Sequence, residues 1–204
     1  MSEKQKMQEG LVYNPLDKEL VALRMRARRI VDRINSTPMT KKGDRKSQFE
    51  SLFGSTGRGF YIESPFHCDY GENITIGDRF FANFGCVILD AAPVTIGNNC
   101  KLGPQVGLYT ATHPVEPEAR IRGEEYALPI ILGDNVWIGG NATINPGVRL
   151  GDNVVVGAGA VVTRSFDNNC VIAGNPARLI RKACSKDFDV SCQQSSHSVP
   201  RSEE

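Results

Sequence analysis

The chain has 204 residues, with 24 lysines and arginines against 23 aspartates and glutamates, so its formal net charge is +1. A balance this even gives no electrostatic reason to expect binding to nucleic acid or to an anionic membrane. The length fits one domain with at most a small appendage. We find no signal-peptide pattern and no apolar run near the roughly 18 residues of a membrane helix, and therefore expect a soluble cytoplasmic protein.

Six cysteines are spread along the chain, and none of them forms a C-x-x-C pair. This spacing predicts neither a zinc site nor a disulfide framework. We expect reduced thiols that are mostly buried or lie in the C-terminal segment. The six are Cys68, Cys86, Cys100, Cys170, Cys184 and Cys192.

The N-terminal part predicts helices. Asp17 is a favourable N-cap for a helix that runs to about Asn35, because its carboxylate can accept hydrogen bonds from free N–H groups of the first turn. Apolar residues fall on one face of this helix: Leu20, Leu23, Ala27, Ile30, Val31 and Ile34. The opposite face is rich in arginine: Arg24, Arg26, Arg28, Arg29 and Arg33. A membrane-surface helix is an alternative, but we favour a solvated face on a helix that packs against its own protein.

A linker of residues 36–43 precedes a second, shorter helix, which we expect to begin at Asp44. Its buried side would be Phe49, Leu52 and Phe53. Residues 1–58 are therefore predicted to form a small helical cap.

The middle of the chain repeats with a period of six. Between residues 132 and 162, aliphatic residues recur at every sixth position, and a second set of smaller aliphatics follows four residues behind each. A period of six is neither the 3.6 of a helix nor the 2 of a strand, and it predicts a parallel β-helix of hexapeptide repeats. The first set is Leu132, Ile138, Ile144, Leu150, Val156 and Val162; the second is Val136, Ala142, Val148, Val154 and Ala160.

Glycine and asparagine fill many positions between these aliphatics, as at Gly133, Asn135, Gly151 and Asn153. We place them at the corners of the solenoid, where they tolerate a positive φ that would strain a β-branched residue.

The same period is present upstream, from about Tyr61. Ile76, Ala82, Ile88 and Val94 keep the six-residue step, the register slips by two, and Ile96, Leu102 and Leu108 then continue it. The pattern breaks after Leu108 and resumes at Leu132. We therefore predict a solenoid over residues 59–182, from which a long polar loop, residues 109–128, is extruded. Such insertions commonly carry function, because the scaffold holds them in place. The serine-rich segment 183–204 is expected to be a disordered tail.

Three histidines are present, and His113 is the candidate for chemistry because it lies in the extruded loop. Imidazole titrates near neutral pH and suits general-base catalysis. Glu116 and Glu118 are close enough in sequence to orient it, and a backbone carbonyl could do so as well. We expect a structural role for His67, and His197 lies in the tail.

Six short motifs resemble the hexapeptide-repeat sugar O-acetyltransferases, a family with maltose, galactoside and nodulation types. The likeness covers about residues 3–182. The motifs are Asp69-Tyr-Gly, Phe80-Phe-Ala-Asn-Phe84, Tyr109-Thr-Ala-Thr-His-Pro114, Asn135-Val-Trp-Ile-Gly-Gly140, Ile144-Asn-Pro-Gly147 and Ala173-Gly-Asn-Pro-Ala-Arg178. The resemblance, and not the period, implies that the β-helix is left-handed, an exception to the usual right-handed crossover.

The resemblance also implies acetyl-CoA-dependent transfer to a sugar hydroxyl, with no metal, in a homotrimer whose active sites lie between subunits. A three-sided prism has flat outer faces, so three prisms can pack about a common axis. His113 matches the family's catalytic histidine. Asn83 matches an asparagine at the acceptor site that stabilises the transition state. Asp69 and Asp90 fall at acceptor-site positions, where carboxylates can accept hydrogen bonds from sugar hydroxyls.

Positions that contact the coenzyme in this family are matched by Trp137, Gly140, Ala158, Thr163, Arg164, Arg178 and Arg181. Arginine suits the phosphates of CoA. Gly140 stands where the galactoside enzymes have a serine that faces the thioester. Trp137 could instead be a packing residue at a corner.

Three alternatives remain at this point. A zinc enzyme of the γ-carbonic anhydrase type would need three converging histidines, and His67, His113 and His197 do not have such spacing. A binding or assembly protein without activity would not need His113 and Asn83. An acyltransferase with a non-sugar acceptor is the third.

Overall fold

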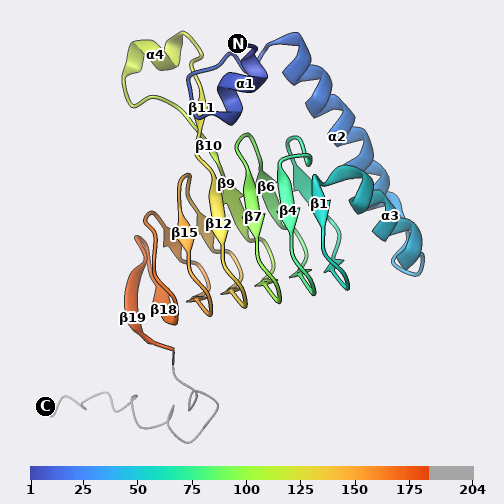
Figure 1. Ribbon diagram of the computed structural model, residues 1–204, viewed down its shortest axis with the longest axis vertical. Helices are drawn as coiled ribbons and strands as arrows, with labels where there is room; N and C mark the ends of the chain where they lie inside the picture. The colour runs from blue at the N-terminus through green and yellow to red at the C-terminus, as the bar shows by residue number, and fades with distance from the viewer. Residues whose placement is uncertain (184–204) are drawn as a thin grey trace, which may run out of the picture.

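The protein, described here by a computed structural model that covers residues 1–183, is a parallel β-helix with helices at its N-terminal end (Figure 1). The predicted tail lies almost entirely outside the described residues. Within residues 1–183, no helix combines the length and the apolar character that crossing a membrane requires.

The cap contains three helices, α1 (Glu3–Gln8), α2 (Lys18–Ser36) and α3 (Lys42–Leu52). The predicted N-cap of α2 is confirmed, since the Asp17 carboxylate accepts from the N–H of Glu19 at 2.9 Å. The helix α3 begins two residues before the predicted start. The short helix α1 was not predicted; it begins with a capping box formed by Ser2 and Gln5.

The apolar faces of the cap helices are buried against the solenoid, as predicted. Five of the six residues on the α2 face are buried and Leu23 is partly buried. Phe49 and Leu52 of α3 are also buried, as is Phe53, the residue that follows the helix. The ring of Phe49 meets that of Phe66 edge-on.

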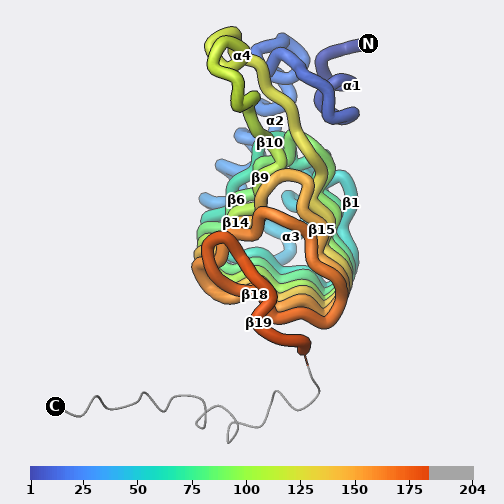
Figure 2. The backbone as a smooth tube through the Cα atoms, turned by 90° about the vertical axis from the view of Figure 1, so that its left-hand side faces the viewer, coloured from blue at the N-terminus to red at the C-terminus, as the bar shows by residue number. Residues whose placement is uncertain are grey.

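The solenoid has three faces, each a sheet of short parallel strands, and Figure 2 shows its coils lying over one another. The first sheet contains β1 (Ser55–Thr56), β4 (Ile74–Ile76), β7 (Val94–Ile96), β12 (Ile130–Leu132) and β15 (Arg149–Leu150). The second contains β2 (Tyr61–Ile62), β5 (Phe81–Ala82), β8 (Lys101–Leu102), β13 (Trp137–Ile138), β16 (Val155–Val156) and β18 (Cys170–Ala173), with β19 (Arg178–Lys182) antiparallel at its edge. The third contains β3 (His67–Cys68), β6 (Val87–Leu89), β9 (Gly107–Tyr109), β14 (Thr143–Ile144) and β17 (Val161–Val162). The first strand, β1, starts before the predicted Tyr61.

The predicted aliphatic sets form the interior. Leu132 pairs with Leu150, Ile138 with Val156, and Ile144 with Val162 in neighbouring coils. All eleven members of the two sets between residues 132 and 162 are buried, with at most 2% of their surface exposed. The six-residue period is therefore confirmed as the repeat of one face of the prism. Cys68, Cys86, Cys100 and Cys170 are buried, unpaired thiols.

One corner is held by a ladder of side-chain oxygens. The backbone N–H of Asp78 donates to Asn98 Oδ1 at 2.9 Å, that of Asn98 to Asp134 at 2.7 Å, and that of Asp134 to Asp152 at 2.8 Å. The N–H of Asp152 continues the ladder to Asn168 at 2.9 Å. Each coil therefore satisfies a corner N–H of the coil before it.

The residue after each ladder position adopts a left-handed backbone conformation. The φ angles lie between 55° and 59° at Arg79, Asn99, Asn135, Asn153 and Asn169. Asparagine tolerates this region because its short polar side chain can bond locally. Here the amides also bond to one another, Asn135 Nδ2 to Asn153 Oδ1 and Asn153 Nδ2 to Asn169 Oδ1, both at 2.9 Å. The predicted place of asparagine at the corners is confirmed.

The coils differ in length. The corner step is 20 residues from Arg58 to Asp78 and again from Asp78 to Asn98, against 18 from Asp134 to Asp152 and 16 from Asp152 to Asn168. The predicted slip of two residues therefore belongs to the longer coils at the start of the solenoid. The step from Asn98 to Asp134 is 36 residues, because this coil contains the predicted loop. The loop is an ordered hairpin of β10 (Ala111–Thr112) and β11 (Tyr126–Ala127) with a short helix, α4 (Pro117–Ile121), near its tip (Figure 1).

The left-handed corner predicts a local stability effect. Replacing Asn153 by valine should lower the free energy of unfolding by about 1–3 kcal/mol, because a β-branched residue is strained at φ 58° and both amide bonds are lost. Chemical denaturation measures this. Asn145→Val is the matched control, since Asn145 lies outside the left-handed region; equal losses in the two variants would contradict the explanation.

Candidate active site

His113 follows β10 in the extruded hairpin, and 56% of its side chain is exposed. Its Nδ1 lies 3.0 Å from the carbonyl oxygen of Glu124. Because a carbonyl can only accept, the ring proton is on Nδ1 and the lone pair of Nε2 is free to take a proton. Glu116 does not orient the ring; its carboxylate caps α4 by accepting from the N–H of Glu118 at 2.9 Å.

A carboxylate lies next to the base nitrogen. Glu125 Oε2 is 3.8 Å from His113 Nε2, and only 18% of the Glu125 side chain is exposed. The hydroxyl of Tyr13 donates to Glu125 Oε1, and the Tyr13 N–H donates to the Glu125 carbonyl at 2.9 Å. Glu125 is therefore held from a segment more than a hundred residues away, and it can stabilise a positive charge on the imidazole.

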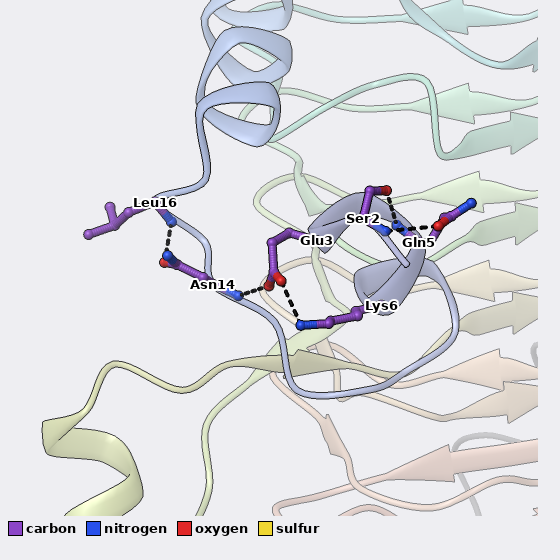
Figure 3. A network of polar contacts seen from close by, with 6 residues as sticks. All are labelled: Ser2, Glu3, Gln5, Lys6, Asn14 and Leu16. Atoms are coloured by element: carbon purple, nitrogen blue, oxygen red, sulfur yellow. Dashed lines mark hydrogen bonds and ion pairs between the residues drawn. The ribbon is translucent and has the colours of Figure 1, made fainter.

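The segment that carries Tyr13 is itself held by α1 (Figure 3). Glu3 Oε2 accepts from the N–H of Asn14, and Glu3 Oε1 accepts from Lys6 Nζ, both at 2.6 Å. Asn14 Oδ1 in turn accepts from the N–H of Leu16 at 3.0 Å. These contacts fix the course of the chain directly after Tyr13 and so help to hold Glu125 beside His113.

A further group of side chains lies near Glu125: Asp69, Tyr70 and Arg24. Arg24 departs from the predicted solvated face of α2, since its NH1 donates to Tyr70 Oη at 2.6 Å and its guanidinium carbon lies 5.6 Å from the Tyr70 ring centroid. Burial raises the pKa of Asp69; the charges of Arg24 and Arg28 oppose this rise and that of Glu125 adds to it. Asp69 is thus within electrostatic reach of both the cap and the hairpin.

Asp90 is buried beneath Asp69 and Tyr70. The sequence predicts that its carboxylate meets the acceptor, but the side chain has no exposed surface. Its Oδ1 accepts from the N–H groups of Asp69 at 3.0 Å and Tyr70 at 2.9 Å, while Oδ2 is buried without a hydrogen-bond partner. Asp90 therefore positions Asp69. Burial raises the pKa of Asp90 to about 7.

Four of the predicted site residues line one groove of about 440 Å³ on the outer face of the second sheet. They are Asn83, Trp137, Gly140 and Ala158. Asn83 Oδ1 accepts from the N–H of Phe84 at 2.8 Å, which leaves the amide hydrogens of Asn83 as the donors. Trp137 is 56% exposed, so it is not buried as a packing residue of the corner in this chain.

Gly140 allows the groove to remain open beside Pro104. A Cβ at this position would lie 3.1 Å from Pro104 Cδ, so any side chain would crowd the proline ring. The backbone N–H remains the polar group that Gly140 can offer.

The remaining coenzyme candidates lie near the C-terminal end of the solenoid, and none of them lines this groove. Thr163, Arg164, Arg178 and Arg181 are exposed. The guanidinium carbon of Arg164 lies 5.2 Å from the Phe166 ring centroid, and Arg178 NH1 donates to the carbonyl of Ala177 at 3.1 Å.

His113 also does not line the groove that contains Asn83. One chain therefore contains two separate groups of candidate site residues, one with His113, Glu125 and Asp69 and one with Asn83 and Trp137. Within residues 1–183, no three histidine, cysteine, aspartate or glutamate side chains gather as metal ligands would.

Sequence reasoning missed Tyr13, Arg24, Tyr70 and Glu125. The break in the six-residue period indicates where the hairpin leaves, but not which residue of its returning strand faces His113. The isolated bridge between Tyr13 and Glu125 is a tertiary contact. The one available signal was Tyr70 in the motif Asp69-Tyr-Gly, which marks an aromatic hydroxyl next to a predicted site residue.

Comparisons with known proteins agree with this architecture. The maltose acetyltransferase hexapeptide capping motif matches residues 6–57, and the hexapeptide repeat of succinyl-transferase matches residues 129–164. A relative from Dictyostelium discoideum is 53% identical over 182 residues, which are 89% of this chain and 95% of that protein.

Two solved structures have the same fold over nearly all of the described chain. The crystal structure of a maltose O-acetyltransferase from Clostridium difficile 630 is 43% identical, with a TM-score of 0.89, and the match covers 90% of this chain and 98% of that one. A galactoside acetyltransferase in complex with coenzyme A is 38% identical, with a TM-score of 0.89, and the match covers 92% and 94%.

Buried Asp90 predicts a pH-dependent difference between the wild type and Asp90→Asn. The pKa of Asp90 is raised in the fold from 3.8 to about 7, so its contribution to stability is full below pH 3.8 and is lost as the pH rises to 7. Asparagine does not titrate. The free energy of unfolding of the wild type, relative to the variant, should therefore fall across this window in denaturation curves. A difference that is constant with pH would contradict the assignment.

Proposed function

The chain belongs to the hexapeptide-repeat family of acetyl-CoA-dependent sugar O-acetyltransferases, and we propose that it transfers an acetyl group to a hydroxyl of a sugar such as maltose or glucose, with His113 as the general base. The observation that most directly supports this proposal is the contact between His113 Nδ1 and the Glu124 carbonyl. This contact leaves Nε2 of an exposed imidazole free to accept a proton. This protein is an acetyltransferase, and we expect it to act in the cytoplasm.

In the first step, His113 Nε2 takes the proton of the acceptor hydroxyl as its oxygen attacks the thioester carbonyl of acetyl-CoA. The imidazolium that forms lies beside the Glu125 carboxylate. This contact stabilises the charge in a partly buried setting, where a paired carboxylate is worth more than in water. Breakdown of the tetrahedral intermediate expels the CoA thiolate, which can take the proton back from His113.

The negative oxygen of the tetrahedral intermediate needs a donor. Asn83 can supply one, because its Oδ1 is used by the Phe84 N–H and its amide hydrogens are left for the reacting group. The Gly140 N–H is a second candidate in the same groove. A fixed amide of this kind costs little reorganisation when charge develops.

The groove beside Asn83 fits the thioester end of the coenzyme. Its lining is mostly apolar, with Trp137 exposed along it, as suits a pantetheine arm. The galactoside acetyltransferase of similar fold was solved with coenzyme A. Thr163 and the guanidinium groups of Arg164, Arg178 and Arg181 lie further along the solenoid, where we propose that the arginines meet the CoA phosphates.

A homotrimer would join these two groups of residues into one site. The hairpin exposes large apolar side chains that no other residue of the described chain, 1–183, covers: Val115 is 89% and Ile121 85% exposed. Packing this hairpin against a neighbouring prism would bury them. His113 of one subunit would then face the groove with Asn83 of the next, and Asp69 would bind the hydroxyls of the acceptor.

Removing the base is the direct test. His113→Ala should lower kcat for acetyl transfer to maltose by about 10²–10⁴-fold, the usual contribution of a general base, as measured by CoA release. Glu118→Ala is the matched control on the same hairpin, since Glu118 contributes backbone groups to the hydrogen bonds of α4, which alanine keeps, and the variant should keep full activity. An active His113→Ala variant would refute the mechanism.

The shared site predicts complementation between two inactive variants. Asn83→Ala should lose about 10²–10³-fold in kcat. Subunits of His113→Ala and Asn83→Ala, unfolded and refolded together, should regain activity, because some interfaces then pair an intact His113 with an intact Asn83. The same variants refolded separately and then mixed are the control. If co-refolding restores nothing while native mass spectrometry shows mixed trimers, both residues of a site come from one subunit.

A further inference from the structure

A second hollow opens on the other side of Asp69. It is a groove of about 360 Å³ between α2 and the outer face of the third sheet, within the size range of small-molecule sites. Arg28 and Asp32 line it from α2, and His67 and Leu89 line it from the sheet. Nothing in the mechanism above uses these four residues.

Strand geometry explains why the sheet side of this groove is polar at one point and apolar at the next. Successive side chains of a strand point to opposite faces. Cys68 of β3 points into the prism and is buried, so its neighbours His67 and Asp69 face outward. Cys68 pairs with Ile88, which likewise points inward, so Leu89 lies outside next to Asp69.

Asp69 connects this groove to the reaction site. It is one of the lining residues of the groove, and its N–H is held from behind by Asp90. Its neighbour Tyr70 packs in the same buried cluster as Tyr13, whose hydroxyl donates to Glu125 beside His113. A molecule whose reacting hydroxyl meets His113 and whose body reaches Asp69 can therefore continue into the groove.

The residues that line the groove indicate which part of a substrate would bind there. Arg28 offers planar donors, Asp32 and Asp69 offer acceptors, and His67 can do either. Two carboxylates, Asp32 and Asp69, disfavour a phosphate, and the guanidinium of Arg28 disfavours a cationic group. Leu89, with Val31 of α2, adds an apolar wall. Alternating donors and acceptors over a small apolar surface fit a neutral ring with many hydroxyls.

We propose that this groove is a second acceptor subsite, which binds the sugar ring next to the one that is acetylated, so that a neutral disaccharide is a better acceptor than a monosaccharide. The inference rests on the proposed function, because the first ring must sit between His113 and Asp69. Its residues are specificity determinants for the acceptor and have no part in the chemical step.

The test compares kcat/KM for maltose and for glucose at saturating acetyl-CoA. The wild type should prefer maltose. Arg28→Ala and His67→Ala should each reduce kcat/KM for maltose about tenfold more than for glucose, since a hydrogen bond to a charged or polar partner is lost with the second ring only. Most of the change should appear in KM, because ground-state and transition-state binding are weakened alike.

Arg29→Ala is the matched control. Arg29 is the next residue of the same helix, but it lines a different hollow together with Arg26 and Arg33, so both acceptors should keep their wild-type values. Equal kcat/KM for maltose and glucose in the wild type, or a proportional loss for both sugars in Arg28→Ala and His67→Ala, would overturn the second subsite and leave the proposed function intact. Failure to acetylate any sugar, with CoA binding retained, would overturn the proposed function and the subsite together.

Discussion

The whole architecture depends on one constraint, that each coil places its aliphatic side chains directly over those of the coil before it. The pairing of Ile76 with Ile96, Ile96 with Leu132, and Leu132 with Leu150 meets this constraint across coils of three different lengths. The apolar interior drives the stacking. The corner ladder of aspartate and asparagine oxygens then fixes the register, because a coil that slipped would leave its corner N–H groups without their partners. Gly133 shows how tight the corner is, since a Cβ there would lie 2.3 Å from Asp152 Oδ1.

A scaffold with this constraint can accept insertions only between rungs, and the hairpin of residues 109–128 is such an insertion. It leaves after β9 and returns at β12, and the rungs on either side pair as though it were absent. Its own order comes from outside the solenoid. The strand β10 pairs with β11, and Tyr13 of the cap adds a bridge to Glu125. The helical cap thus does more than cover the open end of the prism; it fixes the surroundings of His113.

The region around His113 and Asp69 contains several charges that the fold alone would not favour. Asp90 is ionisable and fully buried, with one oxygen left without a partner. Asp69 and Glu125 lie near each other and depend on Arg24 and Arg28 for compensation. Buried and clustered carboxylates disfavour their own charged forms. Their concentration around an exposed imidazole distinguishes this region from the rest of the solenoid, whose interior is apolar.

The sequence by itself determined the repeat, and with it most of the fold. The aliphatic residues that recur between Leu132 and Val162 could be assigned to the interior, because the same position of every six-residue repeat faces the same way. Asn135 and Asn153 could be assigned to the corners, because few residues tolerate a positive φ. Asp17 and the apolar face of α2 were equally local signals. The loop was predicted as an interruption, and His113 as its reactive residue.

Only the tertiary structure decided how the site is assembled. The carbonyl that orients His113, the carboxylate beside it, and the tyrosine that holds that carboxylate come from Glu124, Glu125 and Tyr13, and no spacing relates the last to the others. Asp90 looked like a ligand for the acceptor and is a support for Asp69 instead. The period of a sequence indicates which way a side chain points from its own strand or helix. A site forms where separate elements meet, and how they meet depends on the packing of the cap, the hairpin and the solenoid.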